Sequence, residues 1–364
     1  MKLRCERDTL VEALQTAGRA VSGRGGQLPV LSGLHLVLSG DELVVTGSDL
    51  ELTIARTLTV NGETNGTAVI PAKLLIDVVR SLEAGAIELD LSELDLTIRG
   101  GRSEFSIRTI PSDEFPQLVG AEGPEVKIEA ASFVAALGQV VPAASSDDSR
   151  PILTGVLMAP SEVGLRLVAT DSYRLAVAEV PGASVLEGDQ SVLVPSRALG
   201  EVRRVVGEAP ELTLRLSDKN ASFEIDGLVV TTGLIEGDFP KYQGLIPTTQ
   251  SNELSVPREA VLDAVRRVRL LAQESTPIRL VMNGDGLEIV AITQDVGEGH
   301  ETVDAAYSGE ELTVAFNPSF LLDGLDIAPG EEITLHTIDS LKPAVIRCPG
   351  NEHFLYLLMP VRVP

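Results

Sequence analysis

Arg150-Pro151-Ile152-Leu153-Thr154-Gly155 repeats the pattern of Leu28-Pro29-Val30-Leu31-Ser32-Gly33, which lies 122 residues earlier in the chain. Thr276-Pro277-Ile278-Arg279-Leu280 is a weaker third copy. Landmarks that keep their order at a spacing near 120 residues indicate a tandem repeat of three units, each the size of a domain and too long for a solenoid repeat. Two more sets recur at this spacing: Ile70-Pro71-Ala72-Lys73, Val194-Pro195-Ser196-Arg197 and Asn317-Pro318-Ser319-Phe320, then Glu114-Phe115-Pro116, Asp238-Phe239-Pro240 and Leu358-Met359-Pro360.

Each unit has the same order of elements. Apolar residues at i, i+3, i+4 and i+7 predict a first helix over 8–20, with Asp8 as its N-cap, and related helices over 132–143 and 257–271. A second helix is expected after the shared Pro71, Pro195 and Pro318, because proline suits a first helical turn. Alternating segments such as 34–38 and 42–46 predict strands. The pattern predicts an α+β fold with three domains, 1–122, 123–250 and 251–364, each with two helices on antiparallel sheets.

A short polar turn in the second unit combines residue types that are common at binding sites. The alternating stretch 165–169 predicts a strand, and Thr170-Asp171-Ser172 favours a turn because these side chains bond to nearby backbone. Tyr173-Arg174-Leu175 follows, and aromatic and Arg side chains are enriched at binding hot spots. The alternative is a structural turn with Arg174 in a salt bridge. Gly47-Ser48-Asp49-Leu50 holds the same place in the first unit, so the turn aspartate is expected to belong to the fold.

Composition restricts the class of protein. The 364 residues carry 53 acids and 29 bases, and a net charge of −24 disfavours nucleic acid unless a basic surface is concentrated locally. The two cysteines lack CxxC partners, and no apolar run is long enough for a signal peptide or a membrane span, so we expect a soluble cytosolic protein without disulfides, metal or cofactor. No catalytic motif is found, so we expect no enzyme activity.

The expected helices do not share this excess of acidic residues. Together the six helical segments carry no net charge, so the whole −24 falls on the rest of the chain. Lys73 and Arg80 lie seven residues apart on one helix, and Arg197 and Arg204 repeat that spacing 124 residues later. Residues seven apart share a helix face. The spacing indicates either a phosphate-facing helical surface or ordinary solvated faces.

These landmarks resemble the family of bacterial DNA polymerase III β subunits, the sliding clamps. The resemblance rests on 169–176, Gly237-Asp238-Phe239-Pro240-Lys241-Tyr242, 302–309 and the terminal 358–363, and it extends over the whole chain. It implies a head-to-tail homodimer that encloses duplex DNA as a ring and serves as a non-catalytic processivity factor. The alternative from the residues is a peptide-binding scaffold that does not encircle DNA.

The resemblance also implies a hydrophobic pocket between the second and third domains, which takes short peptides from the polymerase α subunit, the clamp loader δ subunit and other proteins with a clamp-binding motif. Ser172, Tyr173 and Pro343 depart from the usual family residues, so the pocket rim is expected to prefer a different peptide. The implied pocket residues are Leu153, Thr170, Ser172, Tyr173, Arg174, Leu175, Pro240, Gly244, Leu245, Asn317, Phe320, Leu341, Pro343, Leu357, Met359, Pro360 and Val361.

Two further surfaces follow from the same resemblance. The implied DNA neighbours are Arg24, Lys73, Arg80, Arg150 and Arg197. The implied dimer contacts are Arg102, Phe105, Ile107, Leu270 and Leu271, together with acids near 295–301. Glu104 stands where a base is common in the family, and the alternating pattern also allows Phe105 and Ile107 to be core residues.

Overall fold

The computed structural model describes residues 1–21, 28–112, 115–116, 120–186, 188, 190–272 and 276–362. The chain forms two compact units, Met1–Ala130 with Glu201–Leu234 and Ala131–Gly200 with Ile235–Pro364. Six helices occur in the described residues, two for each repeat, which confirms the predicted α+β fold: α1 (Arg7–Gly18), α2 (Ala72–Ser81), α3 (Ala130–Val140), α4 (Ser196–Val205), α5 (Arg258–Val268) and α6 (Pro318–Ile327).

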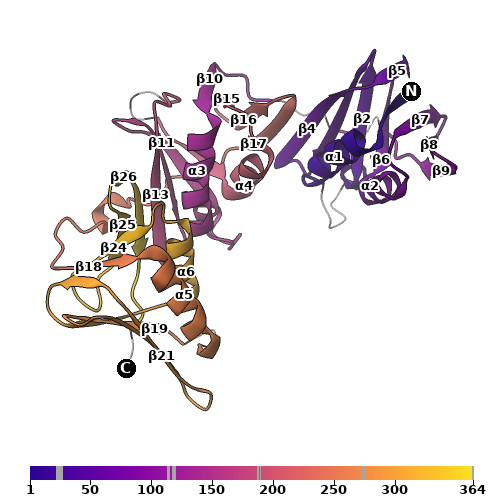
Figure 1. Ribbon diagram of the computed structural model, residues 1–364. Helices are drawn as coiled ribbons and strands as arrows, with labels where there is room; N and C mark the ends of the chain where they lie inside the picture. Colours follow the sequence, from indigo (N-terminus) through magenta and orange to yellow (C-terminus); the bar gives the residue numbers. More distant parts are fainter. Residues whose placement is uncertain are drawn as a thin grey trace. The chain divides into compact units, whose positions relative to one another are not determined.

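The first unit contains two antiparallel sheets. One has the strand order β5-β1-β7-β8-β9 and the other β10-β15-β16-β17-β4-β3-β2-β6. Figure 1 shows α1 and α2 side by side in this unit. The strands are β1 (Lys2–Glu6), β2 (Gly33–Ser39), β3 (Glu42–Ser48), β4 (Leu52–Thr59), β5 (Asn61–Thr64), β6 (Gly66–Pro71), β7 (Ala86–Ser92), β8 (Asp95–Gly100), β9 (Ser103–Arg108), β10 (Glu125–Glu129), β15 (Glu211–Leu216), β16 (Asn220–Ile225) and β17 (Leu228–Gly233).

The second unit also contains two antiparallel sheets, ordered β14-β11-β12-β13-β26-β25-β24-β18-β22 and β21-β20-β19-β23. Helices α5 and α6 are in contact beside them (Figure 1). The strands are β11 (Gly155–Pro160), β12 (Gly164–Thr170), β13 (Arg174–Pro181), β14 (Val192–Pro195), β18 (Asn252–Pro257), β19 (Ile278–Asn283), β20 (Gly286–Thr293), β21 (Gly297–Val303), β22 (Ala306–Ser308), β23 (Leu312–Phe316), β24 (Glu332–Thr337), β25 (Ala344–Cys348) and β26 (Asn351–Leu358).

Hydrophobic periodicity explains these elements. On α1 the buried residues are Leu10, Ala13, Leu14 and Ala17, the stripe that the sequence predicted. Gly47 on β3 permits α1 to approach, because a Cβ at that position would lie 2.1 Å from the carbonyl oxygen of Ala17. The core of the first repeat therefore depends on a helix that lies directly on its sheet.

Several helix boundaries differ from the prediction. Helix α1 begins at Arg7 with Glu6 as its N-cap, so Asp8 lies in the first turn, where a negative charge suits the helix dipole. The second helices follow the shared prolines as predicted: Pro71 and Pro195 end strands β6 and β14, and α2 and α4 begin at the next residue. At α6, Pro318 is itself the first helical residue and Asn317 is the N-cap.

Two sheets cross from one repeat to the next. Strand β4 of the first repeat pairs with β17 of the second, and β13 of the second pairs with β26 of the third. For this reason the two compact units do not coincide with the three repeats. The predicted domain boundaries after residues 122 and 250 remain a prediction.

Candidate peptide-binding site

The candidate site is built where β13 meets β26. These strands are antiparallel, with Leu175 opposite Leu357. The polar turn 170–174 leads directly into β13, and the main-chain N–H of Met359, just beyond β26, donates to the carbonyl of Tyr173 at 2.9 Å. The second and third repeats therefore share one continuous backbone scaffold under the site.

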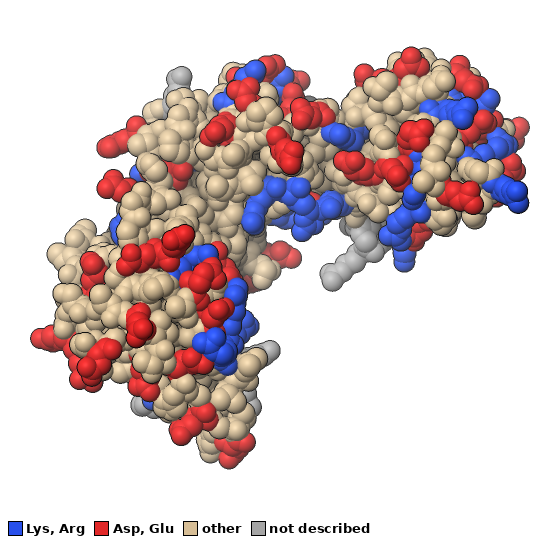
Figure 2. All heavy atoms as spheres, in the orientation of Figure 1, with Lys and Arg blue, Asp and Glu red and all other residues tan. Residues whose placement is uncertain are grey.

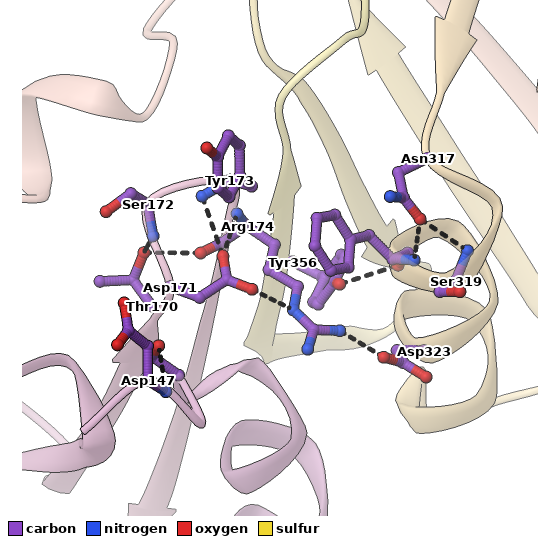
Figure 3. A network of polar contacts seen from close by, with 12 residues as sticks. Asp147, Thr170, Asp171, Ser172, Tyr173, Arg174, Asn317, Ser319, Asp323 and Tyr356 are labelled. Atoms are coloured by element: carbon purple, nitrogen blue, oxygen red, sulfur yellow. Dashed lines mark hydrogen bonds and ion pairs between the residues drawn. The ribbon is translucent and has the colours of Figure 1, made fainter. Parts of the chain in front are cut away.

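Asp171 fixes the conformation of the turn. Its Oδ1 accepts hydrogen bonds from the main-chain N–H groups of Tyr173 and Arg174 at 2.9 and 3.0 Å (Figure 3). The hydroxyl of Thr170 donates to the carbonyl of Arg174 at 2.6 Å. Ser172 has φ of +82°, a left-handed conformation that costs free energy for a residue with a side chain. The turn holds Tyr173 outward, with 59% of it exposed.

Arg174 ties this turn to α6. Its guanidinium side chain is 10% exposed, donates to Asp171 Oδ2 at 3.0 Å, and also pairs with Asp323 of α6. It lies over the ring of Phe320 at 4.5 Å, and Tyr173 stacks on the same ring at a centroid distance of 6.1 Å. The structural interpretation of Arg174 therefore holds, because the cation orders the aromatic pair that borders the site.

Tyr356 supports the same arrangement from β26. Its hydroxyl donates to the carbonyl of Phe320 at 2.8 Å. Burial, opposed in part by the nearby Arg174 cation, raises the pKa of Tyr356. The phenol consequently stays protonated near neutral pH and remains a donor.

An apolar cluster forms the floor of the site. The buried members are Val168, Leu175, Tyr242, Val345, Leu355 and Leu357. Leu157, Val177, Phe239, Ile246 and Met359 are partly buried against them. Met359 combines a flexible thioether with an accessible position, which suits adaptable contact with apolar ligand side chains.

A cavity of about 390 Å³ continues this site. It is lined by residues 243–249 together with Ile338, Lys342 and Pro343. Its volume lies in the range of small-ligand pockets, and its wall is partly polar. An extended peptide with apolar anchors and polar register contacts fits such a surface.

The predicted pocket residues are brought together to different degrees. Leu175, Leu357 and Met359 belong to the apolar cluster, and Gly244, Leu245 and Pro343 line the cavity. Thr170, Ser172, Tyr173 and Arg174 form the turn, while Asn317 caps α6 beside Phe320 by accepting from the N–H groups of Ser319 and Phe320. Leu341 is 59% exposed, Val361 is 38% exposed, and Pro360 lies between the cluster residue Met359 and Val361. Leu153 is buried and Pro240 is exposed, and both lie outside the cluster and the cavity lining.

Sequence reasoning missed several members. Phe239 and Tyr242 flank the predicted Pro240, so their apolar character was an available signal. Lys342 stands between the predicted Leu341 and Pro343. Asp323 had no sequence signal, since only the fold brings α6 to the turn.

The first repeat junction provides a comparison within the same chain. There the N–H of Gly233 donates to the carbonyl of Glu51 at 3.2 Å, which matches the bond from Met359 to Tyr173. Asp49 accepts from the main-chain N–H groups of Glu51 and Leu52, as Asp171 does in the second repeat. The expectation that this aspartate belongs to the fold is thus confirmed in two repeats. Glycine in place of Met359 leaves the first junction without the corresponding apolar side chain.

The predicted DNA neighbours lie on helices or next to the turn. Lys73 and Arg80 are exposed on α2, where Arg80 pairs with Asp77 at 2.9 Å. Arg197 is exposed on α4, which also carries Arg203 and Arg204, and Figure 2 shows basic side chains gathered there. Arg150 pairs with Asp147 at 2.9 Å. Arg24 falls outside the described residues.

The predicted dimer contacts differ in how exposed their side chains are. Arg102 is exposed, Phe105 on β9 is 39% exposed, and Leu270 is 84% exposed, while Leu271 is half-buried next to Gly299. Ile107 is only 3% exposed and packs in the core of the first repeat, which is the alternative that its alternating pattern allowed. Its side chain is therefore a core residue, and we correct its assignment as an interface side chain.

Other kinds of site find no support in the described part of the chain. There, no group of His, Cys, Asp and Glu side chains is arranged to hold a metal ion. The helices are also too short or too polar to cross a membrane, as far as the described residues go.

Comparison with known proteins matches the whole chain. Three family models align in order, described as the N-terminal, central and C-terminal domains of the DNA polymerase III beta subunit, at residues 1–119, 127–241 and 243–362. The beta sliding clamp of Streptomyces coelicolor is 33% identical, with 100% of both chains covered. The crystal structure of the Bacillus subtilis sliding clamp superimposes with a TM-score of 0.94 at 28% identity, and that of the Pseudomonas aeruginosa sliding clamp bound to griselimycin with 0.93 at 28%; both alignments cover 100% of each chain.

Proposed function

The chain belongs to the DNA polymerase III beta subunit family, the sliding clamps, and we propose that it encircles duplex DNA as a ring-shaped homodimer and tethers replication proteins to it. The observation that carries this proposal is the match of three consecutive domains over the full length of the chain. Its role is that of a non-catalytic processivity subunit.

The sheet edges support a head-to-tail dimer. Strand β9 ends one sheet of the first unit and β21 ends one sheet of the second, so within the described residues a single chain offers two different strand edges that have no further strand paired to them. Exposed edges are usually covered or paired. Pairing β9 of one copy with β21 of another is a heterologous contact, and two such contacts close a ring if the rotation is right. Arg102, Phe105, Leu270 and Leu271 are the side chains we assign to it.

The distribution of charge supports a weak, sequence-independent contact with DNA. We assign Lys73, Arg80, Arg150 and Arg197, together with Arg24, as neighbours of the phosphate backbone. Several cations of the helices are already paired with acids, as in Arg80 with Asp77 and Arg266 with Asp263 and Asp326. A modest free positive charge attracts phosphate without the strong salt-dependent binding that would prevent sliding.

The pocket is assigned to partner peptides. We propose that the apolar cluster and the cavity receive the clamp-binding segments of the polymerase α subunit, the clamp loader δ subunit and other replication and repair proteins in the cytoplasm. Tyr173 and Phe320 form an aromatic border that apolar anchors can pack against. The departures at Ser172, Tyr173 and Pro343 support a peptide preference specific to this chain.

Native mass measurement at micromolar concentration tests the assembly. The proposal predicts a mass of two chains. A mass of one chain at every concentration would support the alternative, a peptide-binding scaffold that does not enclose DNA.

A further inference from the structure

Neighbouring repeats are joined at two places within the chain, where β4 pairs with β17 (the first junction) and β13 pairs with β26 (the second junction), and the strands pair in the same way at both. In each, the third strand after the first helix of a repeat pairs antiparallel with the last strand of the next repeat. At the first junction Ile54 lies opposite Val230, and at the second Ala176 lies opposite Tyr356. The matching backbone bonds from Gly233 to Glu51 and from Met359 to Tyr173 show that the two junctions have the same register.

Strands β21 and β9 hold the corresponding places in the third and first repeats. The β20–β21 hairpin matches β12–β13, since Gly286-Leu287 corresponds to Gly164-Leu165 and Leu287 pairs with Val303 as Leu165 pairs with Val180. The β8–β9 hairpin matches β16–β17, because each closes with a two-residue turn. Neither β9 nor β21 has a partner on its outer side in the described chain.

If β21 of one copy pairs with β9 of another in the register of the two internal junctions, Gly299 lies opposite Phe105 and His300 lies opposite Glu104. Burial supports this match independently. Val230 and Tyr356, the counterparts of Phe105, are both 0% exposed, whereas Phe105 is 39% exposed in the single chain. A Cβ at Gly299 would lie 2.9 Å from Leu271, so Leu271 already covers the position that Phe105 would face. The register therefore places the exposed apolar residues of both edges together.

We propose that His300 and Glu104 form a cross-strand pair between two copies, in the register Gly299 opposite Phe105, and that protonation of His300 tightens the dimer. The inference rests on the proposed function. The corresponding pairs at the two internal junctions are apolar, Ala55 with Val229 and Val177 with Leu355. Of the three strand pairings, only the proposed one between two copies therefore has titratable groups at this position.

The surroundings of His300 are acidic. Its Nδ1 lies 2.8 Å from Glu288 on the neighbouring strand β20, and its Nε2 lies 4.0 Å from Glu298 on β21. On α5, which packs against β21, Arg267 is paired with Glu301 at 2.7 Å. The arriving β9 would add a third carboxylate to the same imidazole.

The charges around Glu104 set the strength of this pair. Glu104 accepts from Arg99 on β8 at 2.7 Å, and Arg99 also contacts Glu88 on β7 at 3.3 Å. The guanidinium is therefore shared between two acids. With a neutral His300, Glu104 would meet Glu298 and Glu288 with only part of the Arg99 charge to offset the repulsion.

The sign of the pH effect follows from these neighbours. Because the dimer brings one more carboxylate to His300 than the monomer has, the imidazolium is better stabilised in the dimer, and association takes up protons. Affinity should rise as pH falls through the histidine range. A cross-strand charge pair at each of two ring interfaces corresponds to roughly 2- to 30-fold tighter dimerisation at pH 6 than at pH 8.

Sedimentation equilibrium of the full chain at low salt, at pH 6 and pH 8, tests the pair. We expect the pH effect to be lost in His300→Gln and reduced in Glu104→Gln. The matched control is His353→Gln, because His353 is also a half-exposed histidine, 3.3 Å from Glu179. A dimer whose affinity does not depend on pH, or a pH effect retained in His300→Gln, would overturn the pair while leaving the clamp intact. A monomer at both pH values would overturn the proposed function itself.

Disulfide trapping tests the register separately. Ser106 and Glu298 are exposed and would lie directly opposite each other, whereas Ser106 and Thr302 would lie four residues out of register. Ser106→Cys with Glu298→Cys should give a covalent dimer under mild oxidation, and Ser106→Cys with Thr302→Cys should not. The reverse result would overturn the proposed pairing.

Discussion

Met359 and Gly233 occupy the same place at two repeat junctions, and only Met359 adds a side chain to the apolar cluster. Met359→Ala is expected to weaken binding of a clamp-binding peptide by about 1–3 kcal/mol, because the shortened side chain no longer packs against an apolar anchor of the peptide. Isothermal calorimetry measures the change. Val163→Ala truncates another exposed aliphatic side chain, 40% exposed in a hairpin turn, and should leave the affinity unchanged. Equal losses of affinity in both variants would contradict the assignment of Met359.

Leu175 belongs to the same cluster but contributes to folding stability, not to an accessible contact surface. It is 1% exposed, so Leu175→Ala removes core packing, and such truncations typically cost about 2–5 kcal/mol of folding stability. For this reason Met359, and not Leu175, is the residue that separates binding from folding.

Arg174 is the residue that holds the rim. Arg174→Met keeps the aliphatic stem but leaves Asp171 without its cation, and we expect a loss of about 2 kcal/mol in unfolding free energy. The value is below that for a fully buried pair because the side chain of Asp323 is 42% exposed. Urea denaturation measures it. Arg204→Met, whose side chain is 62% exposed and pairs with Glu201, is the control and should change stability little. Equal stability of Arg174→Met and the parent chain would show that this network does not order the turn.

Residue-level prediction from sequence succeeded where a pattern was local. Tyr173, Arg174 and Leu175 could be singled out because they follow a turn that the first repeat shares. Asp323 could not, since its role depends on the fold bringing α6 to Arg174. Ile107 shows what an alternating pattern cannot predict. The pattern separates the two faces of an edge strand, but it does not say whether the apolar face packs in the core of its own chain or against a partner.

At the level of elements, the repeat predicted the fold well. The Pro29 and Pro151 landmarks both form short 3-10 turns, at Pro29–Ser32 and Pro151–Thr154, before equivalent strands. What the sequence did not predict is that neighbouring repeats share sheets. That pairing depends on strand edges far apart in the chain, and edge pairing leaves no local periodicity.

The edge strands carry the prediction about assembly. Leu270→Asp should dissociate the dimer, because a charge would be buried in the proposed interface without a partner. Analytical ultracentrifugation reports the mass. Leu50→Asp places the same charge at a leucine that is 57% exposed on a turn of the first repeat and should remain dimeric. A fully dimeric Leu270→Asp chain would place the interface elsewhere.

The helices carry the prediction about DNA. Lys73→Ala combined with Arg197→Ala should reduce the dependence of DNA affinity on salt, with the slope falling by about 0.9 for each phosphate that the protein no longer neutralises. Lys127→Ala with Lys219→Ala removes the same charge from strand β10 and a strand turn and serves as the control. Fluorescence anisotropy over a salt series measures both slopes. An unchanged slope in the helix variant would remove Lys73 and Arg197 from the DNA-facing surface.

For the whole molecule, a topological contact reconciles the acidic composition with the binding of DNA. A net charge of −24 repels phosphate at a distance, while helices with no net charge leave the enclosed surface close to neutral. The sequence could predict this division of charge because helices and strands differ so clearly in acidity. The residue patterns alone could not predict that two chains close into a ring, since closure depends on the geometry of the two strand edges.

Retention on circular DNA tests the central claim most directly. Loaded onto a nicked circular plasmid by a clamp loader and passed through a sizing column at moderate salt, the protein should co-elute with the circle and be released when a restriction enzyme linearises it. Release that is equally fast from circular and linear DNA would contradict a closed ring around the duplex.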